Sequence, residues 1–166
     1  VDLSPSKAKF DANAERIALF VGRLHPIKNL PTLLKAWAKV RPSGWRLKLA
    51  GSDEVGHCAE LRALARSLKV EHLVEFCGPV YGEEKEALFA DAELFLLISK
   101  SENFGVAAAE ALATGLPVIA SKSTPWSCLE KEELGWWIND SIDSVAATIE
   151  SVTKLSSDTL RERGQR

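Results

Sequence analysis

The 166-residue sequence contains no methionine, only one tyrosine, and three cysteines that form no CxxC pair. Three widely spaced cysteines do not suit a disulfide framework or a zinc site, so we expect reduced thiols. No apolar run reaches the length of a membrane span, and the polar opening residues lack the hydrophobic stretch of a signal peptide. Because the native start codon is not in this chain, we expect the natural protein to extend further on the N-terminal side.

An excess of charge of either sign is also missing. The chain has 21 basic and 23 acidic residues, a formal net charge of -2. Nucleic-acid binding usually needs a basic excess, so the composition argues against that class of partner. Apolar residues make up 46% and charged residues 27%, which is the ordinary balance of a single globular domain.

Strand-like and helix-like segments alternate along the chain. Short apolar runs predict strands at 17–21, 45–51, 74–78, 93–99 and 117–121, with an edge strand at 135–138. Helical spacing predicts helices beginning after a cap at Asn29 and at 57–69, 83–90, 105–114 and 141–155, followed by a polar helix at the end. This order predicts an α/β fold, an open, doubly wound parallel sheet with 93–99 near its centre and no internal repeat.

Two glutamates, Glu102 and Glu110, surround the predicted start of the helix at 105–114. A helix N-terminus favours phosphate through its unpaired N–H groups and its dipole. Acids beside it are poor phosphate ligands but good acceptors for neutral hydroxyls. In parallel sheets such sites lie beyond the carboxyl ends of the strands. We therefore interpret the segment as a site for a nucleotide-sugar, although Glu102 alone could simply serve the helix dipole.

Two cations follow the first predicted strand. After the turn residue Gly22, Arg23 and Lys28 project from the segment VGRLHPIKN. Opposite a helix N-terminus, they could clamp a diphosphate without a metal ion. Solvated surface charges are the alternative reading of this pair alone. An acidic triplet, Asp91-Ala92-Glu93, is interpreted as a helix cap and solvated turn, not as a metal site.

Taken together, the segments VGRLHPIKN, AGSD, EFCGPV and SENFGVAAAEALATGLPVIAS resemble the C-terminal donor-binding half of retaining glycosyltransferases of family 4, which have the two-lobed GT-B architecture. The resemblance covers residues 16–166. It implies that 1–15 is an interdomain lead-in and that the N-terminal acceptor-binding lobe is absent. It also implies a Rossmann-like fold and a cytoplasmic location, with any contact with the inner face of the membrane made by the absent lobe.

The resemblance also implies a role for each matching residue. Arg23 and Lys28 would neutralise the diphosphate leaving group, and Glu102 would accept a hydroxyl of the donor sugar; these three are the candidate catalytic residues. Glu110 would hold both ribose hydroxyls. The remaining donor-binding candidates act through backbone: Gly22, Gly51, Val80, Asn103, Phe104, Gly105 and Val106. No cofactor and no metal are implied.

The segment STPWSCLEKEELGWWIND departs from the commonest pattern of the family. It resembles a subset associated with lipopolysaccharide or exopolysaccharide assembly, in which Trp126 could pack on the donor sugar while Ser123 and Thr124 reach its hydroxyls. Of the two adjacent tryptophans, Trp136 and Trp137, alternation on a strand predicts one in the core and one at the rim. The three histidines, His25, His57 and His72, are interpreted as solvent-facing.

Three functions stay open at the level of sequence. The first is a donor domain of a retaining hexosyltransferase, inactive as a fragment, that acts on a glycan or lipid-linked acceptor. The second is a nicotinamide-dependent oxidoreductase, which would need a GxGxxG turn where this chain has only Gly22. The third is a non-catalytic nucleotide-binding or interaction domain. The base, the sugar, the acceptor and the linkage are not specified by these residues.

Overall fold

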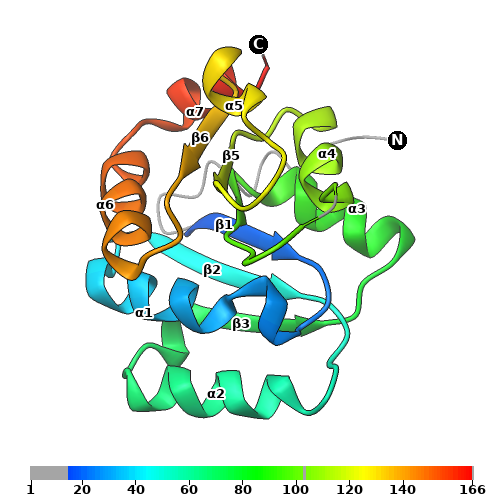
Figure 1. The fold of residues 1–166 in the computed structure, drawn as a ribbon, viewed down its shortest axis with the longest axis vertical. Coiled ribbons are helices and arrows are strands. Elements are labelled where there is room, and N and C mark those ends of the chain that lie inside the picture. The colour runs from blue at the N-terminus through cyan, green and yellow to red at the C-terminus, as the bar shows by residue number, and fades with distance from the viewer. Residues whose placement is uncertain (1–14, 103, 166) are drawn as a thin grey trace.

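Six parallel strands form one sheet in the order β3-β2-β1-β4-β5-β6 (Figure 1). The structure is a computed structural model and describes residues 15–102 and 104–165. Its strands are β1 (Arg16–Val21), β2 (Trp45–Ala50), β3 (Val74–Gly78), β4 (Leu94–Leu97), β5 (Val118–Ser121) and β6 (Gly135–Ile138). The predicted doubly wound parallel sheet is therefore confirmed, with β6 at one edge as expected.

Helices cover both faces of the sheet. On one face α1 (Leu30–Val40) packs between α2 (His57–Ser67) and α6 (Ile142–Thr153), whereas α3 (Gly82–Asp91) and α4 (Val106–Ala113) lie on the other (Figure 1). Shorter elements are η2 (Pro26–Lys28), η3 (Glu71–Leu73), α5 (Cys128–Lys131) and α7 (Ser157–Gly164). None of the helices within 15–102 and 104–165 is long and apolar enough to cross a membrane.

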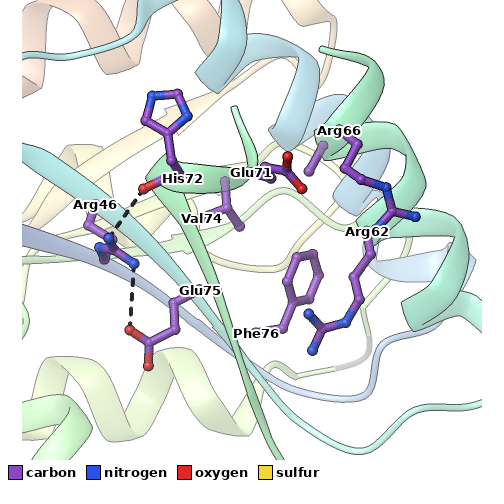
Figure 2. Close-up of a pocket in the computed structure, with 9 residues that line it drawn as sticks. Arg46, Arg62, Arg66, Glu71, His72, Val74, Glu75 and Phe76 are labelled. Carbon is purple, nitrogen blue, oxygen red and sulfur yellow. Dashed lines mark hydrogen bonds and ion pairs between the residues drawn. The ribbon is translucent and has the colours of Figure 1, made fainter. Parts of the chain in front are cut away.

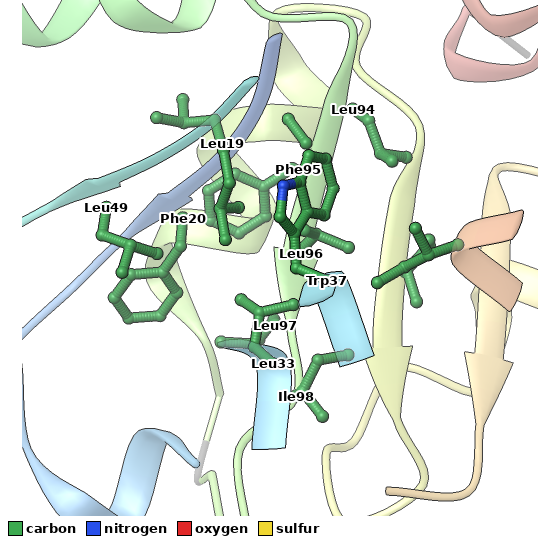
Figure 3. Packing of buried hydrophobic residues seen from close by; sticks show 14 of the residues in the cluster. Leu19, Phe20, Leu33, Trp37, Leu49, Leu94, Phe95, Leu96, Leu97 and Ile98 are labelled. Carbon is green, nitrogen blue, oxygen red and sulfur yellow. The ribbon is translucent and has the colours of Figure 1, made fainter. Parts of the chain in front are cut away.

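The core lies along the two inner strands, β1 and β4, and beneath α1 (Figure 3). Strand β4 is buried on both faces, which is why its sequence LFLL is continuously apolar. From α1, Leu33 and Trp37 reach this layer with at most 1% of their surface exposed. On the opposite face Phe89 of α3 stacks on Phe95 with ring centroids 5.9 Å apart. The apolar runs of the sequence thus fix the centre of the sheet.

The order of the strands reverses between β1 and β4. Along the chain β1 is followed by β2 and β3 on one side, and β4 then begins the other side of the sheet. Connections that leave β1 and β4 consequently run to opposite faces and diverge at their carboxyl ends. Open α/β sheets bind ligands at such a switch point. The segments after β1 and β4, which carry the candidate residues, meet there.

Local details differ from the sequence-based predictions at two points. The short helix α5 was not predicted, because its four residues carry no periodicity that could be recognised. Asn29 precedes α1 as predicted, but its side chain does not cap the helix. Its amide donates to the carbonyl of Ile98, 3.2 Å away, and its oxygen accepts from Thr32. This buried asparagine therefore ties α1 to the segment after β4.

Candidate functional site

Backbone hydrogen bonds join the segments that follow the first three strands. The N–H of Leu24 donates to Ser52 and the N–H of Gly51 donates to Gly78, each at 2.9 Å. A Cβ at Gly51 would lie 1.6 Å from the carbonyl oxygen of Gly22, so this approach requires a glycine. The packing of these loops therefore explains why position 51 is a glycine. Its predicted contact with a ligand stays a prediction.

Lys28 and Glu102 meet across the switch point. The Lys28 Nζ lies 2.8 and 3.1 Å from the two carboxylate oxygens of Glu102, and Ser99 Oγ donates to the same group at 2.9 Å. Only 12% and 13% of the two charged side chains is exposed. The backbone adds a further tie, because the N–H of Lys100 donates to the carbonyl of Ile27. Two motifs far apart in the sequence are therefore one structural unit.

The other two charged candidates also have partners. Arg23 makes an ion pair of 3.1 Å with Glu54 and stays 55% exposed. Glu110, one turn into α4, lies 3.0 Å from Nζ of Lys85 on α3. An acid in this apolar stretch of small residues needs a polar partner, and Lys85 is that partner in the free protein. At the carboxyl ends of β1 and β4, called the rim from here on, cations and acids are thus paired with each other.

Gly105 immediately precedes the helix α4, and its φ of 80° is in the left-handed region that glycine tolerates. A Cβ there would lie 2.9 Å from Trp126 Nε1 and 3.0 Å from Leu97. Trp126 donates to the carbonyl of Phe104 at 2.6 Å, and the two rings lie 5.6 Å apart. The indole of the TPW segment therefore braces the entry to α4, whose first N–H groups lack intrahelical partners.

The remaining donor-binding candidates lie around the same rim. Val80, in the segment after β3, is half-buried against the core, whereas Phe104 and Val106 expose 56% and 65% of their surface. Asn103 lies outside the described residues. Tyr81, 74% exposed, follows Val80. The candidates that follow β1, β3 and β4 therefore all lie at the carboxyl ends of the strands, as predicted from the parallel topology.

Two predictions about the divergent segment, one for Thr124 and one for the adjacent tryptophans, are wrong. Thr124 is 3% exposed and donates to the carbonyl of Ser121, so its hydroxyl is used inside the protein. Trp136 and Trp137 are both half-buried, one beneath Arg163 and the other donating to Thr124, so neither is a core residue. A cation that stacks on an exposed ring face can stabilise a half-buried indole in this way.

Two further predictions need correction. His57 is only 5% exposed at the start of α2, and its Nδ1 lies 3.1 Å from Glu60. His25 is half-buried and its Nδ1 accepts from the N–H of Ile27, which caps η2; His72 is exposed as predicted. Glu93 of the acidic triplet is not a solvated turn residue, because Arg16 binds its carboxylate at 2.8 Å.

Sequence reasoning missed three residues of the rim: Ser99, Glu54 and Lys85. Ser99 ends the segment after β4 and is fully buried. Lys85 was recognisable in principle, since every other charged residue of α3 is acidic: Glu83, Glu84, Glu86 and Asp91. A lone cation on an acidic helix indicates an acidic partner elsewhere. No pattern in the sequence identifies Glu54 as the partner of Arg23.

A separate hollow of about 330 Å³ lies at the other end of the sheet, between α2 and the edge strand β3 (Figure 2). Arg46, Arg62 and Arg66 surround it, and none of the candidate site residues lines it. Arg46 contacts Glu75 and the carbonyl of His72, and Arg62 stacks over Phe76 at 4.6 Å. The guanidinium groups of Arg46 and Arg62 are thus engaged by the protein itself. The carboxyl ends of β1 and β4, where the predicted residues meet, stay the candidate functional site.

Comparison with known proteins identifies the family. The family model described as "Glycosyl transferases group 1" matches residues 5–166. The chain belongs to this family. An uncharacterized glycosyltransferase of Methanocaldococcus jannaschii is 33% identical over 141 residues, which cover 83% of this chain and 36% of the relative. The predicted resemblance to a glycosyltransferase is therefore confirmed.

A second relative of this glycosyltransferase family is more informative. The GDP-mannose:cellobiosyl-diphosphopolyprenol alpha-mannosyltransferase of Komagataeibacter xylinus is 34% identical over 119 residues, 70% of this chain and 30% of the relative. The chain thus spans about a third of the length of these two relatives. Among solved structures, the sucrose-phosphate synthase of Thermosynechococcus elongatus superimposes with a TM-score of 0.84 at 26% identity, covering 98% of this chain and 42% of that one.

Proposed function

We propose that this chain is the donor-binding domain of a retaining glycosyltransferase and that it binds a nucleoside-diphosphate sugar at the rim between β1 and β4. The observation that carries the proposal is the Lys28–Glu102 contact of 2.8 Å at the switch point. It brings the cation of one motif and the acid of the other together beside the N-terminus of α4. Family membership and the name of the GDP-mannose-dependent relative support the same ligand class.

The paired side chains retain capacity for a ligand. An arginine has five N–H donors, and one nitrogen of Arg23 is engaged by Glu54. The Lys28 ammonium has three donors and directs two contacts at Glu102. A carboxylate offers about four acceptor sites, of which Glu102 uses three. Both cations therefore keep donors for a diphosphate, and Glu102 keeps one acceptor site for a sugar hydroxyl, with these pairs intact.

The proposed chemistry follows from that arrangement. In retaining transfer the bond between the anomeric carbon and the phosphate oxygen breaks, and negative charge grows on the departing diphosphate. Arg23, Lys28 and the first N–H groups of α4 face that charge, so they stabilise the transition state more than the ground state. Loss of one such donor typically costs about 3 kcal/mol of barrier. The charge is met by protein groups alone, so the proposal needs no metal.

The wider role is part of the same proposal. The transferred unit is a hexosyl group, and the acceptor is a glycan or a lipid-linked sugar used in cell-surface polysaccharide or lipopolysaccharide synthesis. The acceptor would be bound by a separate N-terminal lobe, at the cytoplasmic face of the membrane. The lipid-linked acceptor in the name of the Komagataeibacter xylinus relative supports this class. The fragment without that lobe would bind the donor and not turn it over.

Thermal unfolding with a nucleotide panel tests the proposal. We expect UDP, GDP or ADP to raise the midpoint: at 100 times Kd a ligand adds about 2.7 kcal/mol, or roughly 5–10 °C for a domain of this size. Glu110→Ala should reduce the shift to about half or less, since a hydrogen bond to a charged group is lost, whereas Lys39→Met, in an exposed pair with Asp143, should preserve it. A shift with NAD and none with a nucleoside diphosphate would support the oxidoreductase instead. Absence of any shift would support a non-catalytic interaction domain that binds no nucleotide.

A further inference from the structure

The ion pair between Lys85 and Glu110 joins α3 to α4. Its two charged atoms are 3.0 Å apart, and 31% and 39% of the side chains is exposed. The other charged residues of α3 are acidic, so Lys85 is the one cation that this helix offers to Glu110. The pair also involves Glu110, the residue proposed to bind ribose.

The surroundings of Glu110 leave its orientation to this one contact. The residues three and four positions away on α4, which share its side of the helix, are Val106, Ala107, Ala113 and Thr114. The hydroxyl of Thr114 donates to the carbonyl of Ala111, so none of the four binds the Glu110 carboxylate. Within residues 15–102 and 104–165, the Lys85 ammonium is the polar partner of this carboxylate. Fixing a flexible acid before the ligand arrives reduces the entropy that binding must otherwise remove.

We propose that Lys85 is a positioning residue that orients the Glu110 carboxylate toward the two ribose hydroxyls of the donor; this rests on the proposed function. The lysine contacts one carboxylate oxygen, Oε1. The second oxygen and the remaining lone pair of the first stay available, which suffices for two hydroxyl donors. Lys85 can therefore remain in place while the ribose binds.

The position of Lys85 on α3 adds a second consequence. This helix begins two residues after Val80, whose backbone is the candidate neighbour of the base. The ion pair thus links the element that follows the base-facing segment to the element that carries the ribose acid. A ligand with a base but no second ribose hydroxyl would gain less from it.

Calorimetry with a ribose and a 2′-deoxyribose ligand tests this role. The probe is whichever of UDP, GDP and ADP binds best, together with its 2′-deoxy form. Wild type should prefer the ribose form by about 10-fold or more, since a hydrogen bond to a charged group is at stake. Lys85→Met should weaken the ribose form about 10-fold and the 2′-deoxy form by less, because that form keeps only one hydroxyl to bind Glu110. Lys85→Arg should restore the preference, and Lys39→Met should not alter it.

The combination with Glu110→Gln completes the test. If Lys85 acts through Glu110, the double variant should discriminate no less than Glu110→Gln alone, because interacting residues are not additive. Tighter binding by Lys85→Met would overturn the inference, as it would show that the lysine competes with ribose. Equal weakening of both forms, or unchanged binding, would also overturn it while leaving the proposed function intact. No binding to wild type would overturn both.

Discussion

Removal of Lys28 tests whether the two motifs of the rim form one buried unit. In Lys28→Met, the Glu102 carboxylate would keep Ser99 as its donor but lose both contacts with the ammonium. Breaking a fully buried ion pair by removing one partner costs about 3–5 kcal/mol. Because 12–13% of each side chain is exposed and a hydroxyl remains, we expect about 2–4 kcal/mol here.

Urea unfolding at pH 7 measures this cost, provided that the slope with denaturant is unchanged. The expected loss corresponds to a fall of roughly 5–15 °C in the thermal midpoint for a domain of this size. Lys28→Met/Glu102→Gln should recover part of the loss, since no uncompensated charge remains. The matched control is Lys39→Met, whose ion pair is shorter, 2.6 Å, but whose partners are 58% and 86% exposed.

Burial and not distance should therefore decide the outcome. Lys39→Met should leave the midpoint close to that of wild type, since exposed pairs contribute little. The reasoning is refuted if Lys28→Met is as stable as Lys39→Met, or if the double variant is less stable than the single one. Either result would mean that Lys28 and Glu102 are not held together as the 2.8 Å contact requires.

Two more predictions concern the loops and a thiol. Gly51→Ala should lower stability by about 3 kcal/mol or more and weaken nucleotide binding, because the new Cβ would lie 1.6 Å from the Gly22 oxygen; unchanged urea unfolding would contradict this. Burial and then Glu75 raise the pKa of Cys77 from 9.0 to about 11. With Cys58 and Cys128 replaced by serine, Cys77 should react with a thiol reagent at pH 8 about 10-fold more slowly in folded than in unfolded protein, because a 100-fold smaller thiolate fraction is partly offset by higher nucleophilicity. Equal rates would show that the thiol is not shielded.

The raised pKa of Cys77 also determines how the free energy of unfolding changes with pH. The folded state favours the neutral thiol, so its contribution is present below pH 9 and is lost as pH rises through about 11. Cys77→Ser should remove the loss of stability that the thiol causes as the pH rises from 9 to about 11. Alkaline titration of the wild-type and serine chains by circular dichroism measures the difference. Identical alkaline midpoints would contradict the assignment.

The fold was largely predictable because its inner strands are buried on both faces. Such strands are continuous apolar runs, as in β1 and β4, and turn residues separate them from helices with clear periodicity. Because the strands are parallel, the segments that follow them were expected to meet at the carboxyl ends of the strands. The short α5 escaped because four residues lack a period, and the burial of His57 depends on packing that no local pattern shows.

The sequence predicted which strand ends carry the candidate residues, but not how their side chains pair. Arg23, Lys28 and Glu102 were proposed from their positions after strands, and the structure brings their segments together; their roles stay a prediction. The sequence does not say which acid meets which cation, since ion pairs depend on side-chain reach across elements. Glu54 and Lys85 were missed for that reason. The charge pattern of α3 is the one signal that could have revealed Lys85.

A crystal structure of the chain with a nucleoside diphosphate tests the central claim most directly. The account predicts the diphosphate at the N-terminus of α4, in contact with Arg23 and Lys28, and the ribose hydroxyls on Glu110 with Lys85 still beside it. The protein–ligand distances should be those of hydrogen bonds, about 2.7–3.2 Å. A nucleotide in the arginine-lined hollow between α2 and β3, with the rim empty, would contradict the account.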